Sequence, residues 1–147
     1  MEKLPLRKEI DSKLKWKLED MYPTDQEWER DFAGISEQYP ALAEYRGRLA
    51  ESAETLCAFY QLEEKISLTL EKLYVYARMR KDEDNTVSKY QEMTARTEML
   101  MMQIQASLAF FEPELLKTGQ AKLNRYMEEC PALQDRDFAF KEMFRQK

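Results

Sequence analysis

The chain is poor in the residues that interrupt helices, because its 147 residues include only three glycines and five prolines. Gly and Pro disfavour a helix interior more than any other residue, and sheets with their tight turns use Gly freely. Hydrophobic residues make up 44% of the chain and charged residues 35%, as in an ordered globular domain. We therefore expect an all-α fold, with residues 1–147 in a single helical domain.

Two long helices are expected at the centre of this fold. The first runs from about residue 52 to 81, with Ser52 as its cap and apolar residues close to the helical period. The second spans about 86–111, with apolar spacings that alternate between three and four. Because their connection is short, they should form a long antiparallel hairpin. The acidic connection 82–85 lacks the Gly and the closing Glu of a calcium loop, which favours helix capping there.

The residues before the hairpin divide into an arm and a first helix. Residues 1–23 are expected to form an extended arm, because apolar residues and lysines alternate through Lys13–Leu18. Trp16 would pin this arm to the helical body. The alternative, a surface-bound basic peptide, is opposed by the two acidic residues that follow. Residues 24–119 would hold the main helices, which begin at a capping box with Thr24 as cap.

Residues 120–147 are expected to form the C-terminal helices, the last of which begins near Asp135. Phe140, Met143 and Phe144 fall on one face of that helix, and little sequence remains for them to pack against. No Gly or Pro ends the helix. We therefore expect these helices to have been cut from a longer polypeptide. A natural C-terminus that packs back on the first helix is the alternative.

The residue types limit the chemistry that this chain can perform. It contains no histidine, which excludes Ser–His and Cys–His pairs, imidazole acid–base catalysis and His-ligated metals, and leaves a haem or metal carrier little support. Carboxylate, cysteine and lysine chemistry stay open. Cys57 and Cys130 have no metal-ligand spacing, so we expect reduced thiols, buried or half-buried, in a cytoplasmic protein.

The net charge and the hydropathy of the chain limit the kinds of molecule that it can bind. The net charge is −5 with no basic stripe, which disfavours nucleic acid. No segment approaches the roughly 20 apolar residues of a membrane span, and the N-terminus lacks the apolar core of a signal peptide. A cytoplasmic location with no membrane contact is therefore expected.

Two groups of side chains are candidates for contacts with other molecules. Met99 and Met102 point away from the hairpin seam together with Phe110, as a surface for a partner chain or a missing domain; burial under the first helix is the alternative. Tyrosines and an arginine near the end of the first long helix suit a peptide-contacting rim, or equally an ordinary amphipathic helix end. The candidate interface or channel-wall residues are Tyr74, Tyr76, Met79, Arg80, Met99, Met102, Phe110, Phe140 and Phe144.

Four short segments, in order along the chain, resemble the N-terminal domain of the oligoendopeptidase F family. They are the Trp-Lys-Leu-Glu-Asp-Met-Tyr-Pro-Thr-Asp stretch at 16–25 followed by Trp28, the Tyr-x-Gly-x-Leu stretch at 45–49, the Leu-Tyr-x-Tyr-Ala run at 73–77 with Asp-Glu-Asp at 82–84, and the Phe-x-Pro-Glu segment at 111–114. Together they extend over nearly the whole chain, and they are scaffold positions rather than catalytic ones.

The resemblance implies a mostly helical, cytoplasmic zinc metallopeptidase that cleaves short peptides in a channel between two lobes. In that family the zinc ligands lie on an HExxH helix far toward the C-terminus. This chain has no HExxH, so no catalytic or metal residue is carried over and the 147 residues are expected to be inactive alone. The implied role is the N-terminal lobe that walls the channel, with the missing C-terminal catalytic domain as its partner and zinc only in the parent enzyme.

A second hypothesis comes from a different class of protein. The chain would be a stand-alone helical interaction module without enzymatic activity. It would dimerise through the exposed apolar faces of the second long helix and the Phe-rich terminal helix.

Overall fold

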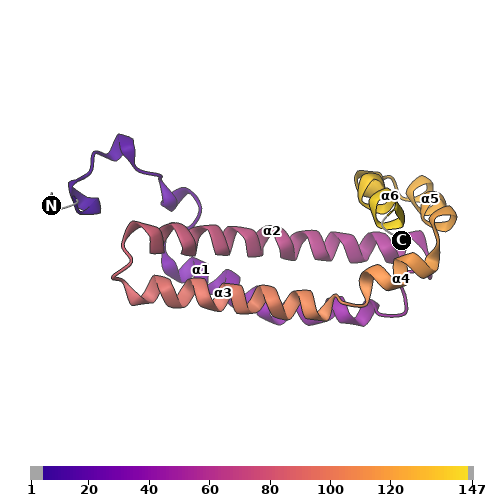
Figure 1. Ribbon diagram of the computed structural model, residues 1–147. Helices are drawn as coiled ribbons and strands as arrows, with labels where there is room; N and C mark the ends of the chain where they lie inside the picture. The colour runs from indigo at the N-terminus through magenta and orange to yellow at the C-terminus, as the bar shows by residue number, and fades with distance from the viewer. Residues whose placement is uncertain (1–4, 146–147) are drawn as a thin grey trace.

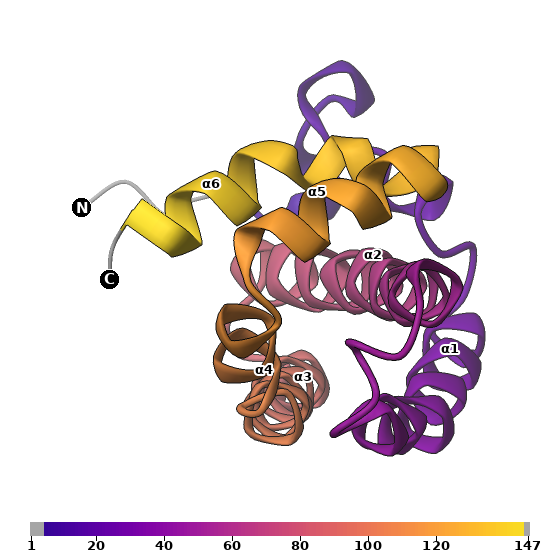
Figure 2. The same ribbon diagram turned by 90° about the vertical axis from the view of Figure 1, so that its right-hand side faces the viewer.

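The computed structural model describes residues 5–145, which contain helices and turns but no strand. The predicted all-α fold is therefore confirmed. The α-helices are α1 (Asp25–Gln38), α2 (Ala53–Glu83), α3 (Ser88–Ser107), α4 (Phe111–Thr118), α5 (Gln120–Glu129) and α6 (Asp137–Arg145), and the 3-10 helices are η1 (Arg7–Glu9), η2 (Ser12–Leu14), η3 (Leu18–Asp20), η4 (Tyr39–Tyr45) and η5 (Pro131–Arg136). Figure 1 shows α1, α2 and α3 running along the length of the molecule, with α4–α6 at one end. Figure 2 looks at the molecule from that end.

The antiparallel hairpin of α2 and α3 is confirmed, and α2 closely matches its predicted bounds. The hydroxyl of Ser52 accepts a hydrogen bond from the backbone N–H of Thr55 at 3.0 Å, so the predicted cap is present. The helix α3 ends at Ser107 and not at 111, because the chain turns there and Phe111 begins α4. Pro113 explains the break, since a proline is tolerated in the first turn of a helix but not in its interior.

The helix α1 packs beside the hairpin and starts at the predicted cap. The side chain of Thr24 accepts from the backbone N–H of Glu27. Trp28 is fully buried, and its indole N–H donates to the backbone carbonyl of Leu73 in α2 at 2.9 Å. On the other side, the guanidinium of Arg96 in α3 forms a two-pronged ion pair with Glu29 of α1 at 2.7 and 2.8 Å. The three helices thus share one core.

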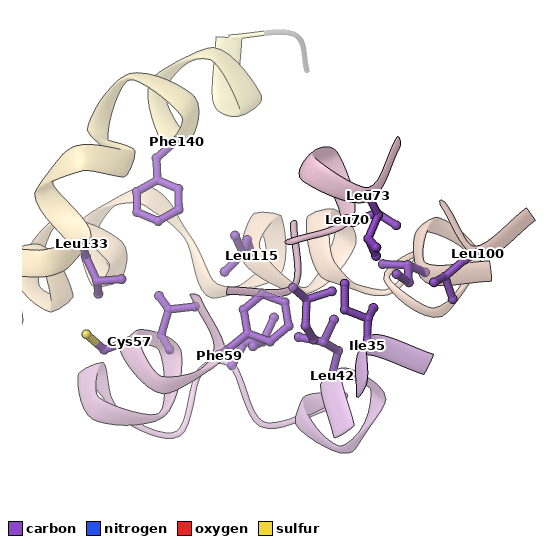
Figure 3. Close-up of a cluster of buried hydrophobic side chains, with 14 of the residues drawn as sticks. Ile35, Leu42, Cys57, Phe59, Leu70, Leu73, Leu100, Leu115, Leu133 and Phe140 are labelled. Carbon is purple, nitrogen blue, oxygen red and sulfur yellow. The ribbon is translucent and has the colours of Figure 1, made fainter. Parts of the chain in front are cut away.

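That core extends without a break from the hairpin to the C-terminal helices. Figure 3 shows side chains of α1, η4, α2, α3, α4, η5 and α6 gathered in it. Phe59 of α2 lies near its middle, stacked on Phe111 of α4 with ring centroids 5.1 Å apart. Aromatic pairs of this kind contribute beyond the area that they bury. The α4–α6 end is therefore held by the same core as the hairpin.

The arm differs from its prediction in two ways. Instead of one extended segment, residues 5–23 make the short 3-10 turns η1, η2 and η3, while residues 1–4 lie outside the described part of the chain. Trp16 is 76% exposed and Leu14 is 79% exposed, so the prediction that Trp16 pins the arm is wrong. Leu18 and Tyr22, both 2% exposed, attach it instead. The 3-10 turns rotate successive side chains away from the two-residue alternation that the prediction assumed.

The last helix does find partners within the chain. Phe140 is buried, with its ring 6.0 Å from that of Tyr60 in α2, and Met143 and Phe144 are partly buried against the same core. The expectation that this face lacks a packing partner is therefore wrong. The alternative, packing on the first helix, is also wrong, because α6 packs on α4, α5 and η5. Gly119, at φ 85°, lets the chain turn back after α4 so that this packing can form.

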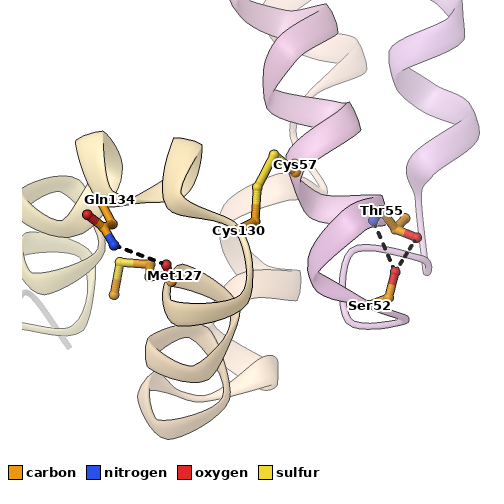
Figure 4. The surroundings of a disulfide bond; sticks show 6 residues. All are labelled: Ser52, Thr55, Cys57, Met127, Cys130 and Gln134. Carbon is orange, nitrogen blue, oxygen red and sulfur yellow. Dashed lines mark hydrogen bonds between the residues drawn. A yellow bond between two sulfur atoms is a disulfide. The ribbon is translucent and has the colours of Figure 1, made fainter.

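The two cysteines form a disulfide bond, so the expectation of reduced thiols is wrong (Figure 4). Cys57 lies near the start of α2, and Cys130 directly follows α5. Their Cα atoms are 6.8 Å apart, although 73 residues separate them in the sequence. They meet because α5 packs across the first turns of α2, a long-range contact that no local pattern reveals.

Candidate functional site

The first and third family-like segments meet at the end of the molecule that carries the arm. The ring of Tyr22 lies edge-on to that of Tyr76 with centroids 5.3 Å apart. The Tyr76 hydroxyl donates to a carboxylate oxygen of Asp25 at 2.8 Å and accepts from the guanidinium of Arg80 at 3.3 Å. Arg80 also forms an ion pair with Glu19 of the arm at 3.2 Å. These motif residues therefore join the arm and α1 to α2.

Asp25 is the acceptor at the centre of this polar cluster. Besides the Tyr76 bond, it receives the ammonium of Lys89 at 2.7 Å and the hydroxyl of Tyr90 at 3.3 Å. Burial alone would raise the pKa of Asp25, but these hydrogen bonds, chiefly those from Lys89 and Tyr76, outweigh it and leave the pKa below its usual value. Burial and the neighbouring carboxylate raise the pKa of Tyr76 to about 12. Both groups are held in their ordinary charge states at neutral pH, as a structural cluster requires.

The second and fourth segments meet at the opposite end. The carboxylate of Glu114 in α4 accepts the backbone N–H groups of Gly47 and Leu49, each at 2.8 Å. Gly47 lies at φ 78°, a backbone conformation that favours glycine. Glu114 thus holds the loop between η4 and α2 against α4 and joins the Tyr-x-Gly-x-Leu segment to the Phe-x-Pro-Glu segment. No local pattern indicates this role of Glu114, because its partners lie more than sixty residues away in the sequence.

The candidate residues near the end of α2 have different environments. Tyr76 is buried and fully engaged inside the molecule. Tyr74, Met79 and Arg80 are half-buried. Met79 lines an open hollow beneath the arm, together with the exposed Trp16. Of these candidates, Met79 and Arg80 therefore lie against the arm.

The remaining candidates do not form one surface. Met99 and Met102 are 58% and 62% exposed, so the alternative in which the first helix covers them is wrong. Phe110 is half-buried against the core at the α4 end of the molecule. The guanidinium carbon of Arg46 lies over its ring, 5.3 Å from the ring centroid. Phe140 is buried and Phe144 is half-buried against the core. Only the two methionines are left widely open to solvent.

A zinc centre does not fit the residues of this chain. The sequence supplies no histidine. Within residues 5–145, His, Cys, Asp and Glu side chains nowhere gather in a group of three that could hold a metal ion. Zinc in proteins is held by three or four such ligands, so this part of the chain offers no site for it. In the same part of the chain, no helix is both long and apolar enough to cross a membrane.

Known proteins similar to this chain are peptidases. The group B oligopeptidase PepB of Streptococcus agalactiae is 33% identical over 141 residues, which are 96% of this chain and 24% of that protein. Oligopeptidase PepF of Bacillus subtilis is 33% identical over 144 residues, 98% of this chain and 22% of that protein. The plasmid-borne oligoendopeptidase F of Lactococcus lactis subsp. cremoris is 37% identical over 142 residues, 96% of this chain and 24% of that protein.

A solved structure shares the fold. The crystal structure of oligoendopeptidase-F from Enterococcus faecium superposes with a TM-score of 0.73 at 24% identity, over 82% of this chain and 24% of that one. No protein-family model matches the chain. The chain spans about a quarter of the length of the relatives that it matches.

The fold and these matches define a helical domain homologous to one part of longer oligopeptidases. Over nearly its whole length the chain is similar to oligoendopeptidase F proteins, and its share of the relatives' length is consistent with the predicted N-terminal domain.

Proposed function

We propose that this chain is the N-terminal helical lobe of a cytoplasmic, zinc-dependent oligoendopeptidase that hydrolyses short peptides. The observation that carries the proposal is identity of 33–37% to oligopeptidases over nearly the whole chain, in a sequence that contains no histidine and therefore no HExxH motif. The lobe would wall the substrate channel, and the metal and the catalytic groups would come from the rest of the protein.

The contacts at the two ends of the lobe support a scaffold role. Asp25 and Glu114 each accept hydrogen bonds from segments far apart in the sequence, so Asp25 fixes α1 on the hairpin and Glu114 fixes the loop before α2 on α4. The exposed Met99 and Met102 are proposed to contact the remainder of the protein, because methionine side chains pack adaptably at interfaces. Tyr74, Met79 and Arg80 are proposed as channel-wall residues.

The test replaces the aligned region of the Bacillus subtilis relative with this chain. With zinc, the chimera should hydrolyse a quenched nonapeptide but leave unfolded casein intact, because the lobe restricts entry to short peptides. The 147-residue chain alone should give no turnover with zinc. Turnover that co-purifies with the isolated chain would contradict the inactive-lobe proposal. A folded chimera that degrades casein as readily as the nonapeptide would contradict the channel role.

A self-associating module is the second candidate function, and the open methionine pair on α3 is the observation that favours it. The two candidates are compatible, because a lobe separated from its partner can pair through the surface that it normally presents to that partner.

A further inference from the structure

A cleft at the α4 end of the molecule has no role in the proposed function. It lies between the loop that precedes α2 and the helix α4, the segments visible at the near end in Figure 2. Its cavity volume is about 570 Å³, which falls in the range of pockets that hold organic ligands. It is lined by Arg46, Gly47, Ala50, Phe110, Pro113, Glu114, Lys117, Thr118 and Lys122.

The cleft is positively charged in an acidic protein. Arg46, Lys117 and Lys122 surround it, and within residues 5–145 none of the three has a carboxylate at ion-pair distance. The chain as a whole carries a net charge of −5. Unpaired cations that converge on one concave surface attract anionic groups more strongly than the same charges spread over a surface.

The one acidic side chain in the cleft is already satisfied. The carboxylate of Glu114 accepts hydrogen bonds from the N–H groups of Gly47 and Leu49, and its backbone carbonyl accepts one from the hydroxyl of Thr118 at 2.9 Å. Lys122 is positioned by a 2.7 Å bond from its ammonium to the carbonyl of Ala50. An ammonium has three donors, so Lys122 keeps donors for a ligand.

The apolar wall of the cleft indicates a ligand larger than an inorganic ion. The ring of Phe110 and the ring of Pro113 form part of the lining, and the guanidinium of Arg46 lies over Phe110. Cation–π contact holds the Arg46 side chain over the ring and leaves its N–H groups free to bind carboxylate. The lining therefore offers both cationic donors and apolar contact, as in sites that recognise acidic peptide motifs.

We propose that this cleft binds short acidic peptides, whose carboxylates are held by Arg46, Lys117 and Lys122 and whose apolar side chain packs on Phe110 and Pro113. The proposal concerns a binding site within these 147 residues and does not depend on the proposed function.

The test is a titration of the chain with a labelled peptide that contains two glutamates and one leucine and is blocked at both ends. At low ionic strength the peptide should bind, and its glutamine counterpart should bind at least about tenfold more weakly. The Arg46→Glu/Lys117→Glu variant should lose about tenfold or more in affinity. The Lys8→Glu/Lys65→Glu variant makes the same change in net charge at exposed sites outside the cleft, and its affinity should stay within about twofold.

Any of the following results would overturn the proposed binding site. Equal losses in the two double variants would mean that the peptide responds to net charge alone. Inorganic phosphate that displaces the peptide with equal affinity would show a site for simple anions. In the unaltered chain, the amide resonances of Gly47 and Thr118 should shift on peptide addition; unchanged resonances would contradict the proposal without any substitution. Binding that disappears in the chimera would show that the rest of the protein fills the cleft.

Discussion

The side chains of Asp25 and Tyr76 show how single positions of this chain hold distant segments together. Tyr76 comes from α2, yet it contacts the Tyr22 ring in the arm and the carboxylate of Asp25 at the start of α1. Asp25 adds contacts to Lys89 and Tyr90 of α3. One carboxylate therefore ties together all three long helices, and buried or half-buried polar groups are costly to leave unpaired.

Replacing Asp25 with Asn should give a stability loss that depends on pH. The native pKa of Asp25 lies below the ordinary value of 3.8, so its stabilising effect is complete above that value and is lost as the pH falls through the lower native pKa. Asp25→Asn should lower the free energy of unfolding by about 1–2 kcal/mol at neutral pH. The difference from the unaltered chain should shrink as the pH falls below 3.8 and through the lower native pKa of Asp25.

Urea denaturation at a series of pH values measures this effect. Asp135→Asn is the matched control, because Asp135 is exposed and its substitution should change little at any pH. A loss for Asp25→Asn that stays constant from neutral to acid pH would show that the charge of Asp25 does not matter.

At the scale of the structural elements, the arm is held to the helices by the residues that it buries and not by Trp16, its largest side chain. The 3-10 turn η3 places Leu18 in the core, whereas Trp16 between η2 and η3 points into solvent. The C-terminal helices show the same dependence on long-range packing, because α5 and α6 are fixed by contacts with α2, by the core around Phe59 and by the Cys57–Cys130 bond.

Leu18 and Trp16 form a matched pair of substitutions for the arm. Leu18→Ala should lower the free energy of unfolding by about 2–4 kcal/mol, because it empties a site in the core. Trp16→Ala should change it by about 0.5 kcal/mol or less, since an exposed side chain loses little on truncation. Thermal or urea unfolding followed by circular dichroism checks both values, and the reverse order of effects would show that Trp16 does anchor the arm.

The disulfide should stabilise the packing of α5 and α6 on α2. Cys130→Ser should lower the free energy of unfolding by about 2–4 kcal/mol, because the bond closes a long loop and restricts the unfolded chain. A reducing agent should destabilise the unaltered chain by a similar amount and leave the variant unaffected. Two titratable thiols in protein purified without reductant, together with a free energy of unfolding that does not change on adding reductant, would contradict this prediction.

At the scale of the whole molecule, α3 leaves a pair of large apolar side chains exposed to solvent. The hairpin buries one side of α3 against α2 and α1, and Met99 and Met102 lie on the opposite side, one helical turn apart. The relatives that it matches are about four times longer than this chain, and we propose that these methionines contact the rest of such a longer protein. Separated from that partner, the chain should pair with itself.

Met102→Glu tests this pairing. Sedimentation or light scattering at high concentration should show self-association of the unaltered chain, and Met102→Glu should remove it with no loss of helicity, because a charge buried without a partner disrupts an apolar contact. Gln103→Glu, which adds the same charge at the neighbouring exposed position, should leave the association in place. A dimer that survives Met102→Glu would show that this surface is not the interface.

The features that could be predicted from the sequence were those determined by residues close together along the chain. Ser52 and Thr24 cap their helices as predicted, and the helical period of the two long segments was enough to predict the hairpin. The family was recognisable because its four segments keep their order. These features follow from local hydrogen bonding and periodicity, which a single chain segment contains in full.

The contacts that local patterns did not reveal join segments separated by dozens of residues. Only the folded chain shows that Leu18 is buried while Trp16 is not, that Cys57 meets Cys130, and that Glu114 holds the loop at Gly47. The cationic cleft likewise draws its lining from both the loop before α2 and the α4–α5 segment. The physical reason is that burial and pairing at these positions depend on how whole helices pack, and several packings are compatible with the same local periodicity.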